Sequence, residues 1–208
     1  MLDFHTHRPN PDSIFNIPFE KAISDAYGEF KYLSAGIHPW NTEAAVIEDY
    51  KALGKLAEDE RIVAIGECGI DKLRGADLQK QEAVFIGHVA LSERLKKPLI
   101  IHCVKAYQQI LKLKRDLNPA QTWVIHGFRG NGILAKQLLD KSIRLSFGEK
   151  FNPEALKAVG AENLLIETDD SETPIEEITA NIASHFEGCT LEQIMEFATA
   201  NALAVIGK

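Results

Sequence analysis

The sequence predicts an α/β fold of the TIM-type (β/α)8 barrel class, and three observations lead to that prediction. Short apolar runs alternate with stretches of helical periodicity, which is typical of a parallel sheet covered by helices. Eight such runs can be counted, one of them doubtful. The chain has 208 residues, 45% of them hydrophobic, and single barrels of this class occupy roughly 200 to 400 residues. We therefore expect residues 1–208 to form a single domain.

The expected strands are apolar runs of five to eight residues, and the second of them is the doubtful one. Pro9, Pro11 and Pro18 fall within residues 8–30 and leave little room there for a full helix. The first β/α unit of the barrel is therefore expected to be abbreviated. In chain order, the expected strands are residues 2–7, 13–17, 31–38, 61–67, 98–103, 122–127, 142–148 and 163–169.

The expected helices follow from residue spacing and from signals at their ends. Residues 77–96 carry apolar side chains at intervals of three and four residues, which places them on one face. Asn152 before Pro153 is typical of an N-cap, and Gly160 of a helix end. Thr173 and Thr190 each open a capping-box pattern. These observations predict helices over residues 42–59, 77–96, 153–159, 174–187 and 191–206.

The composition limits what the chain can bind and where it resides. A formal net charge of −7 argues against a broad nucleic-acid-binding surface, because Lys and Arg neutralise phosphates in such surfaces. The possibility of a local basic site stays open. No run of about 18 uncharged apolar residues and no signal peptide is seen, so no membrane span is expected. The three cysteines are odd in number and lack C-x-x-C spacing, which favours a cytoplasmic location. The oligomeric state stays open.

Histidines and acids stand at the ends of several expected strands. His5 and His7 are two residues apart on the first strand, so they project from one face and can chelate one ion. Four further candidates close other strands, and the carboxyl ends of parallel barrel strands converge at one mouth. These four candidates are Glu67, His102, His126 and Asp169.

Each candidate also has a simpler interpretation. A histidine at a strand end can donate to a backbone carbonyl, and Glu67 or Asp169 can cap the helix that follows its strand. These interpretations do not explain why all six residues share one end of the sheet. Four imidazoles and two carboxylates exceed the needs of one tetrahedral site, so we expect two divalent ions, chosen from Mg²⁺, Mn²⁺ and Zn²⁺.

Longer motifs surround these residues and span nearly the whole chain. They are Asp3-Phe-His5-Thr-His7, Gly36-Ile-His38-Pro39, Gly66-Glu67-Cys-Gly69-Ile-Asp71, Pro98-Leu-Ile-Ile-His102-Cys103, His126-Gly-Phe128, Glu167-Thr-Asp169 and the late Asn201. In this order they make the chain resemble a short, divergent member of the TatD-related family of metal-dependent deoxyribonucleases and hydrolases, which are amidohydrolase-like barrels. The resemblance implies a barrel of the metal-dependent hydrolase type.

The resemblance also implies how the ions are held. A first ion would be bound by His5, His7 and Asp169, and a second by His102 and His126. Glu67 would bridge the two ions.

Two residues near these ligands have open roles. The resemblance places His38 beside the substrate, but a histidine before Pro39 can also serve only to cap a helix. Glu167 either points into the site with Asp169 or is a buried hydrogen-bonding acid.

Some positions depart from the family pattern. Val104-Lys105-Ala106 stands where the family commonly has Arg-Asp-Ala, and Lys105 replaces a bidentate guanidinium imperfectly. Arg129 adds a positive charge near the mouth, whereas residues 170–173 add two acids. These changes disfavour processive action on DNA.

The expected reaction is hydrolysis of a phosphoester bond by a metal-activated water, DNase-like or on a small phosphodiester. Asp169 and Glu67 would be the catalytic residues, and His38, Arg129 and Lys105 would contact a small phosphoester or a nucleic-acid end. Hydrolysis of amides or esters is one alternative, and a metal-binding protein that has lost catalysis is another.

Two other histidines fall within expected helices. For His88 and His185 we expect a solvent-facing or helix-terminus role.

Overall fold

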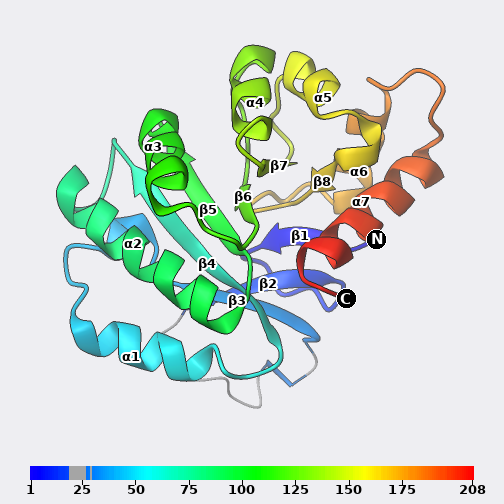
Figure 1. Cartoon of the computed structure of the whole chain (residues 1–208). Coiled ribbons are helices and arrows are strands. Elements are labelled where there is room, and N and C mark those ends of the chain that lie inside the picture. Colours follow the sequence, from blue (N-terminus) through cyan, green and yellow to red (C-terminus); the bar gives the residue numbers. More distant parts are fainter. Residues whose placement is uncertain (19–26, 29) are drawn as a thin grey trace.

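A computed structural model describes residues 1–18, 27–28 and 30–208, and its strands form an eight-stranded parallel sheet (Figure 1). The strands lie in sequence order, and each pairs in parallel with the next. Their bounds are β1 Asp3–Thr6, β2 Ser13–Pro18, β3 Tyr32–Gly36, β4 Ile62–Asp71, β5 Leu99–Val104, β6 Trp123–Ile125, β7 Ile143–Phe147 and β8 Leu165–Ile166.

The last strand returns to the first and nearly closes the sheet into a barrel. Beyond the two residues of β8, a parallel bridge joins Thr6 to Asp169. The amide of Asp169 donates to the carbonyl of His5 at 2.9 Å, and the amide of His7 donates to the carbonyl of Asp169 at 3.2 Å. The predicted barrel class is therefore confirmed, and the same backbone bonds place Asp169 beside His5 of β1 and beside His7, which directly follows that strand.

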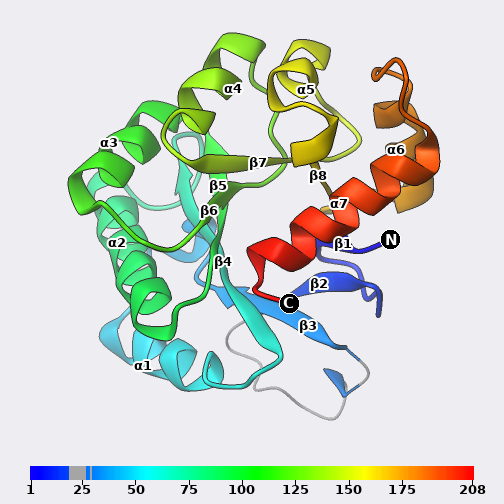
Figure 2. The same cartoon turned by 45° about the vertical axis from the view of Figure 1, so that its right-hand side comes forward.

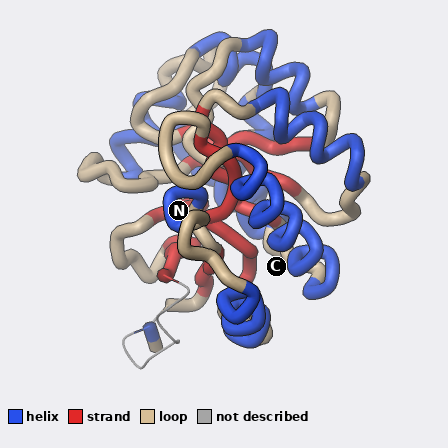
Figure 3. The backbone as a smooth tube through the Cα atoms, turned by 90° about the vertical axis from the view of Figure 1, so that its left-hand side faces the viewer, coloured by secondary structure: helices blue, strands red, loops and turns tan. Residues whose placement is uncertain are grey.

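Helices surround the strands (Figure 3). The predicted ends are accurate at α5, where Asn152 accepts from the amide of Glu154, and at α7, where Thr190 and Gln193 form a capping box. The capping box predicted at Thr173 is wrong. Pro174 occupies the N-cap, and the Thr173 hydroxyl donates to Glu149 instead. The bounds are α1 Ile47–Leu56, α2 Leu78–Leu95, α3 Tyr107–Leu117, α4 Gly132–Leu139, α5 Pro153–Val159, α6 Ile175–Ala183 and α7 Leu191–Val205, with short 3-10 turns η2 Pro39–Asn41 and η3 Ala161–Asn163.

The first β/α unit is abbreviated, as predicted. Residues 7–12 connect β1 to β2 without a helix. The remainder of the proline-containing region falls partly on residues 19–26 and 29, which lie outside the described residues.

The core has two parts, one inside the barrel and one between barrel and helices. The inner cluster fills the amino-terminal end of the barrel and includes Phe4, Ile14, Ile100 and Val124. Ala202, Val205 and Ile206 at the end of α7 belong to the same cluster. Figure 2 shows α7 crossing beside β1 and β2, with the C-terminus next to these strands. The end of α7 therefore closes the barrel at the end opposite to the carboxyl ends of the strands.

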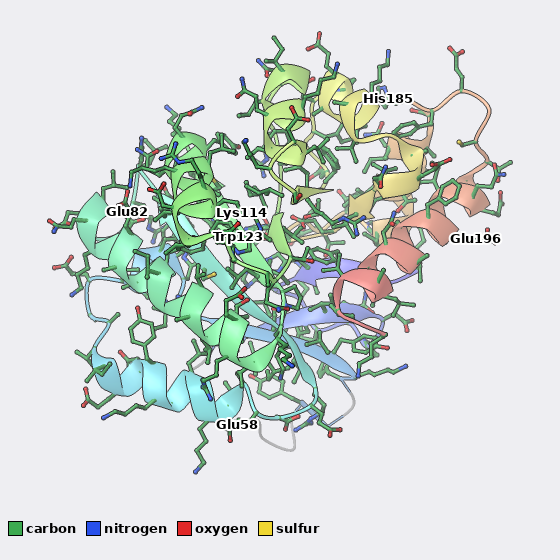
Figure 4. All side chains as sticks on the ribbon, viewed as in Figure 1. Glu58, Glu82, Lys114, Trp123, His185 and Glu196 are labelled. Atoms are coloured by element: carbon green, nitrogen blue, oxygen red, sulfur yellow. The ribbon has the colours of Figure 1, made fainter. Side chains whose placement is uncertain are left out.

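The outer part of the core lies between the strands and the helices that cover them. Trp123 of β6 is fully buried there, and its ring lies edge-on to that of Phe85 from α2. The ammonium of Lys114 on α3 lies 5.0 Å from the centroid of the Trp123 ring (Figure 4). Among the described helices, none combines the length and the apolar composition that crossing a bilayer requires.

Candidate metal centre

Glu67 lies at the centre of the predicted ligand set. Its Oε2 atom is 2.9 Å from His7 Nε2 and 3.5 Å from His5 Nε2. Asp169 completes this side, with Oδ1 at 3.9 Å from His5 Nε2 and 3.7 Å from His7 Nε2. The imidazoles of His5 and His7 and the carboxylates of Glu67 and Asp169 thus surround one small volume.

The second carboxylate oxygen of Glu67 faces a different group of imidazoles. Glu67 Oε1 lies 2.6 Å from His102 Nδ1 and 2.8 Å from His126 Nε2. His38 Nε2 approaches the same oxygen at 3.0 Å. The structure therefore brings all six predicted ligands together and divides them into two groups that share one carboxylate.

Glu67 reaches the interior from within a strand and not from its end. β4 continues to Asp71, and its register against β5 shifts between Ile65 and Cys68. The amide of Glu67 donates to Asn16 Oδ1 at 2.8 Å. At Gly36 an added Cβ would lie 2.7 Å from the carbonyl oxygen of Glu67, so only glycine fits on β3 at this point. The hydrogen bond to Asn16 and the close approach of Gly36 therefore fix the backbone that directs the Glu67 side chain into the site.

Asn16 is a residue of the site that the sequence did not reveal. Besides binding the amide of Glu67, its Oδ1 accepts from the hydroxyl of Ser34 at 3.0 Å. Its Nδ2 lies 3.5 Å from His7 Nδ1, on the side of the ring away from Glu67. The available signal was a polar residue inside the apolar run 13–17. Asn16 orients both the shared acid and one histidine.

The charges of the site are mutually dependent. Burial opposes ionisation of Glu67, but the imidazoles of His126, His102 and His38 hold the pKa of its carboxyl well below the usual range. Burial likewise opposes protonation of His126, yet Glu67 and Glu167 raise its pKa well above the ordinary value. Burial raises the pKa of Asp169. The site therefore holds a buried anion that requires cationic partners.

His5 provides a direct test of whether a cation fits these residues. The side chain is fully buried, and within the described residues neither ring nitrogen has a hydrogen-bond partner. A buried polar atom without a partner costs about 1 to 3 kcal/mol. One nitrogen, Nε2, is directed at oxygens of Glu67 and Asp169 that a divalent ion would also bind. A cation between them satisfies the nitrogen and both acids, so the residues fit a metal.

Two histidines have an acid on the side away from Glu67. Glu167 accepts from His126 Nδ1 at 3.2 Å and from the hydroxyl of Ser146. Asp71 Oδ2 lies 3.3 Å from His102 Nε2. Such carboxylates fix the tautomer and the orientation of metal-binding imidazoles. Glu167 is thus a fully buried acid that contacts a candidate ligand, and Asp71 is a positioning residue that the strand-end argument missed.

The role of Asp71 predicts a change in metal affinity. In Asp71→Asn, His102 loses a carboxylate partner, and we expect the affinity for the ion at this histidine to fall about 10- to 100-fold. Competition with a chromogenic chelator measures the affinity. Asp116→Asn, which alters an exposed acid on α3, is the control. Equal affinities in both variants would contradict the assignment.

His38 caps a helix, which was one of its two predicted interpretations, and it also faces the candidate metal ligands. Its Nδ1 accepts from the amide of Trp40 and caps η2, while Nε2 faces Glu67.

The backbone before His38 is fixed by His88, whose Nε2 accepts from the amide of Ile37 at 2.9 Å. His88 is fully buried, and its other nitrogen donates to the carbonyl of Val84. The expectation of a solvent-facing His88 is therefore wrong. His185 does lie just after α6, against Phe151 (Figure 4).

The burial of His88 predicts a pH-dependent stability. Burial lowers the pKa of His88 from 6.5 to about 4, so below pH 6.5 the unfolded chain binds a proton that the folded chain does not. Between pH 7 and pH 5 this histidine should reduce the free energy of unfolding by about 2 kcal/mol. His88→Gln keeps an acceptor and a donor but does not titrate. Urea unfolding at both pH values measures the free energy of unfolding. Its decrease from pH 7 to pH 5 should be smaller in the variant by about that amount, and an equal decrease in both proteins would contradict the prediction.

The three predicted substrate residues differ in their position relative to the ligands. A cavity of about 580 Å³ opens over the ligands, lined by His38, Trp40 and Tyr27 among others. Arg129 lines a neighbouring cavity of about 290 Å³ together with Asp169 and Lys150. Lys105 is exposed and stands outside both linings.

The sequence is similar to known proteins over much of its length. An uncharacterized metal-dependent hydrolase of Buchnera aphidicola is 35% identical over 146 residues, covering 66% of this chain and 55% of that protein. The 3′-5′ ssDNA/RNA exonuclease TatD of Klebsiella pneumoniae is 33% identical over 147 residues, covering 65% of this chain and 56% of that protein. The chain thus spans little more than half the length of these relatives.

The fold is also similar to that of solved structures. The crystal structure of YJJV, a TatD homologue from Escherichia coli, has a TM-score of 0.81 at 19% identity, over 93% of this chain and 86% of that one. A TatD family hydrolase from Entamoeba histolytica has a TM-score of 0.77 at 21% identity, over 93% of this chain and 83% of that one. The family profile described as TatD related DNase matches residues 15–206. As the motifs predicted, the chain belongs to the TatD-related DNase family.

Proposed function

We propose that this protein is a divalent-metal-dependent hydrolase that cleaves phosphodiester bonds at the end of a single-stranded nucleic acid or in a small phosphodiester. The observation that carries the proposal is the sharing of Glu67 between two groups of imidazoles, at 2.9 Å on one oxygen and 2.6 to 3.0 Å on the other. Two metal ions with a common carboxylate are typical of phosphoryl-transfer sites. The exonuclease name of the Klebsiella relative supports this substrate class.

The residues would hold two ions drawn from Mg²⁺, Mn²⁺ and Zn²⁺. His5, His7 and Asp169 would bind one, His102 and His126 the other, and Glu67 both. When bound, such ions lower the pKa of a coordinated water and polarise a phosphoryl oxygen.

The chain's own groups supply the remaining chemistry. Asp169 lines the cavity and its Oδ1 lies 3.9 Å from His5 Nε2 and 3.7 Å from His7 Nε2, so Asp169 is the proposed general base for the attacking water. The imidazole of His38 lines the cavity and would donate a hydrogen bond to the phosphate. Arg129, beside Asp169 in the adjoining cavity, and the exposed Lys105 would contact substrate further from the ions.

A substrate panel tests the proposal. The purified chain, loaded with Mg²⁺, Mn²⁺ or Zn²⁺ in turn, is assayed on labelled single-stranded DNA and RNA, bis(p-nitrophenyl) phosphate, and aryl amides and esters. We expect hydrolysis of the phosphodiesters and its loss on chelation. Hydrolysis confined to amides or carboxylic esters would overturn the proposal in favour of amidohydrolase-type chemistry. Tight metal binding without any hydrolysis would overturn it in favour of a metal-binding protein that has lost catalysis.

A further inference from the structure

An exposed indole stands at the rim of the metal centre. Trp40 follows His38 in η2, is 41% exposed, and lines the cavity that also contains Glu67 and His102. Its ring centroid lies 4.7 Å from that of His38 and 5.9 Å from that of His102. The ring is anchored, because Nε1 donates to Asp71 Oδ2 at 2.7 Å. A large apolar surface is thus held next to the candidate ligands.

A guanidinium rests on this indole. The Cζ atom of Arg74 lies 3.7 Å from the centroid of the Trp40 ring, which is the geometry of a cation–π contact. Arg74 belongs to the loop that leaves β4 after Asp71 and leads into α2. The cation therefore reaches the rim from a different segment of the chain than the ring that supports it.

A buried side chain of α2 holds the loop that carries Arg74. Gln81, 2% exposed, donates through Nε2 to the carbonyls of Asp71, Arg74 and Ala76 at 3.0, 3.1 and 2.7 Å. Its Oε1 accepts from the amide of Asp71 at 2.8 Å. At Gly75, φ is +95° and an added Cβ would lie 2.2 Å from the carbonyl oxygen of Pro39. These contacts hold the loop directly against η2.

The charges around the mouth differ between its two sides. Asp169 and Asp170 follow β8 on one side, where Arg8 already pairs with Glu172 at 3.0 Å. Arg74 follows β4, four strands away around the barrel. Among the described residues, it has no carboxylate within ion-pair distance, unlike Arg8, Arg61 and Arg115. Its guanidinium keeps donors available for an anion.

We infer that Arg74 and Trp40 form a nucleotide-binding platform, in which Arg74 binds a substrate phosphate and the indole contacts the attached base. The inference rests on the proposed phosphodiesterase function and adds the residues that recognise a nucleotide next to the cleaved bond. A guanidinium binds phosphate through directed hydrogen bonds, and an aromatic ring tolerates any base. The supported Arg74 side chain also loses less conformational freedom on binding than a free one.

Kinetics on a single-stranded oligonucleotide test the phosphate contact. In Arg74→Ala, KM should rise about tenfold or more while kcat stays within a few-fold, because the charged hydrogen-bond partner that is lost does not touch the reacting atoms. The slope of log(kcat/KM) against log[salt] should become shallower by about 0.7, the value for one phosphate contact on a single strand. Arg115→Ala, on the exposed surface of α3, is the charge-matched control. An unchanged slope and KM would overturn the inference.

Fluorescence tests the platform without requiring turnover. Thymidine 5′-monophosphate added to the metal-loaded protein should quench Trp40, since the other tryptophan, Trp123, is fully buried. The Kd should rise about tenfold in Arg74→Ala, and the quenching should disappear in Trp40→Leu. Quenching and weakened binding without cleavage of any phosphodiester would reject the proposed function and keep the platform. Cleavage by the wild type, with no quenching by the nucleotide and no change of KM in Arg74→Ala, would reject the platform alone.

Discussion

Glu67→Gln should reduce phosphodiesterase activity by at least about 10³-fold, the equivalent of the several kcal/mol that metal ions contribute to a phosphoryl-transfer transition state. The substitution keeps the size of the side chain but removes the charge and one of two oxygens that face separate groups of histidines. Both ions should therefore bind more weakly. Activity at saturating Mn²⁺ and the metal content per chain by mass spectrometry measure the two effects.

The matched control for this variant is Glu58→Gln. Glu58 is exposed after α1 (Figure 4) and is absent from the lining of the cavity over the ligands, so its substitution should leave activity and metal content unchanged. If Glu67→Gln kept two ions and lost less than tenfold in activity, the shared carboxylate would not be the organising ligand, and the function proposed from it would fail.

Asp169→Asn should reduce kcat about 10²- to 10⁴-fold, the range expected for loss of a general base. Asparagine keeps an oxygen for a metal ion but cannot accept the proton. It also suits the backbone, because residue 169 has φ +53°, a conformation in which Asn and Asp are several-fold enriched. Stopped assays across pH 5 to 9 provide kcat for both proteins.

Asp169→Ala separates the effect of losing the general base from the effect of the residue type on the backbone. Alanine removes the base as well, but it also places an unfavourable residue at a positive φ and should lower the melting temperature, which the asparagine variant should not do. An asparagine variant with wild-type kcat would show that Asp169 only binds metal.

Periodicity explains why so much of the site is predictable. Alternation along β1 and the residue after it places His5 and His7 on one face, and the parallel topology then gathers His102, His126 and Asp169 at the same mouth. These relations depend on spacing and strand order, which a sequence displays directly.

The remaining features depend on contacts between distant segments. Glu67 reaches the interior through a register shift within a strand that extends beyond it, which no apolar run reveals. Asn16 and Asp71 act through partners 51 and 31 residues away. His88 has the spacing of an ordinary helical residue, and only its bond to Ile37 shows why a buried imidazole is tolerated.

The ends of the helices show the same distinction between features set by neighbouring residues and features set by distant ones. Asn152 and Thr190 are predictable caps because each bonds to an amide two or three residues ahead. Thr173 has an equally good local pattern, but the neighbouring Glu149 competes for its hydroxyl. No bounds are predicted for α3 and α4 from the sequence. Ala106 provides no side-chain cap for α3, whereas Asn131 does cap α4 by accepting from the amide of Leu134.

The closure of the barrel by α7 has a practical consequence for handling the protein. Val205 and Ile206 share the cluster at the amino-terminal end of the barrel with Leu2 and Phe4, and Figure 2 shows both ends of the described chain near β1 and β2. The cavity lies over the ligands at the carboxyl ends of the strands, so the two chain ends are on the other side. An affinity handle or surface tether joined through a flexible spacer after Lys208 would leave the mouth facing the solution. Immobilised protein could then be exposed in turn to chelator, metal and oligonucleotide on a single sensor surface.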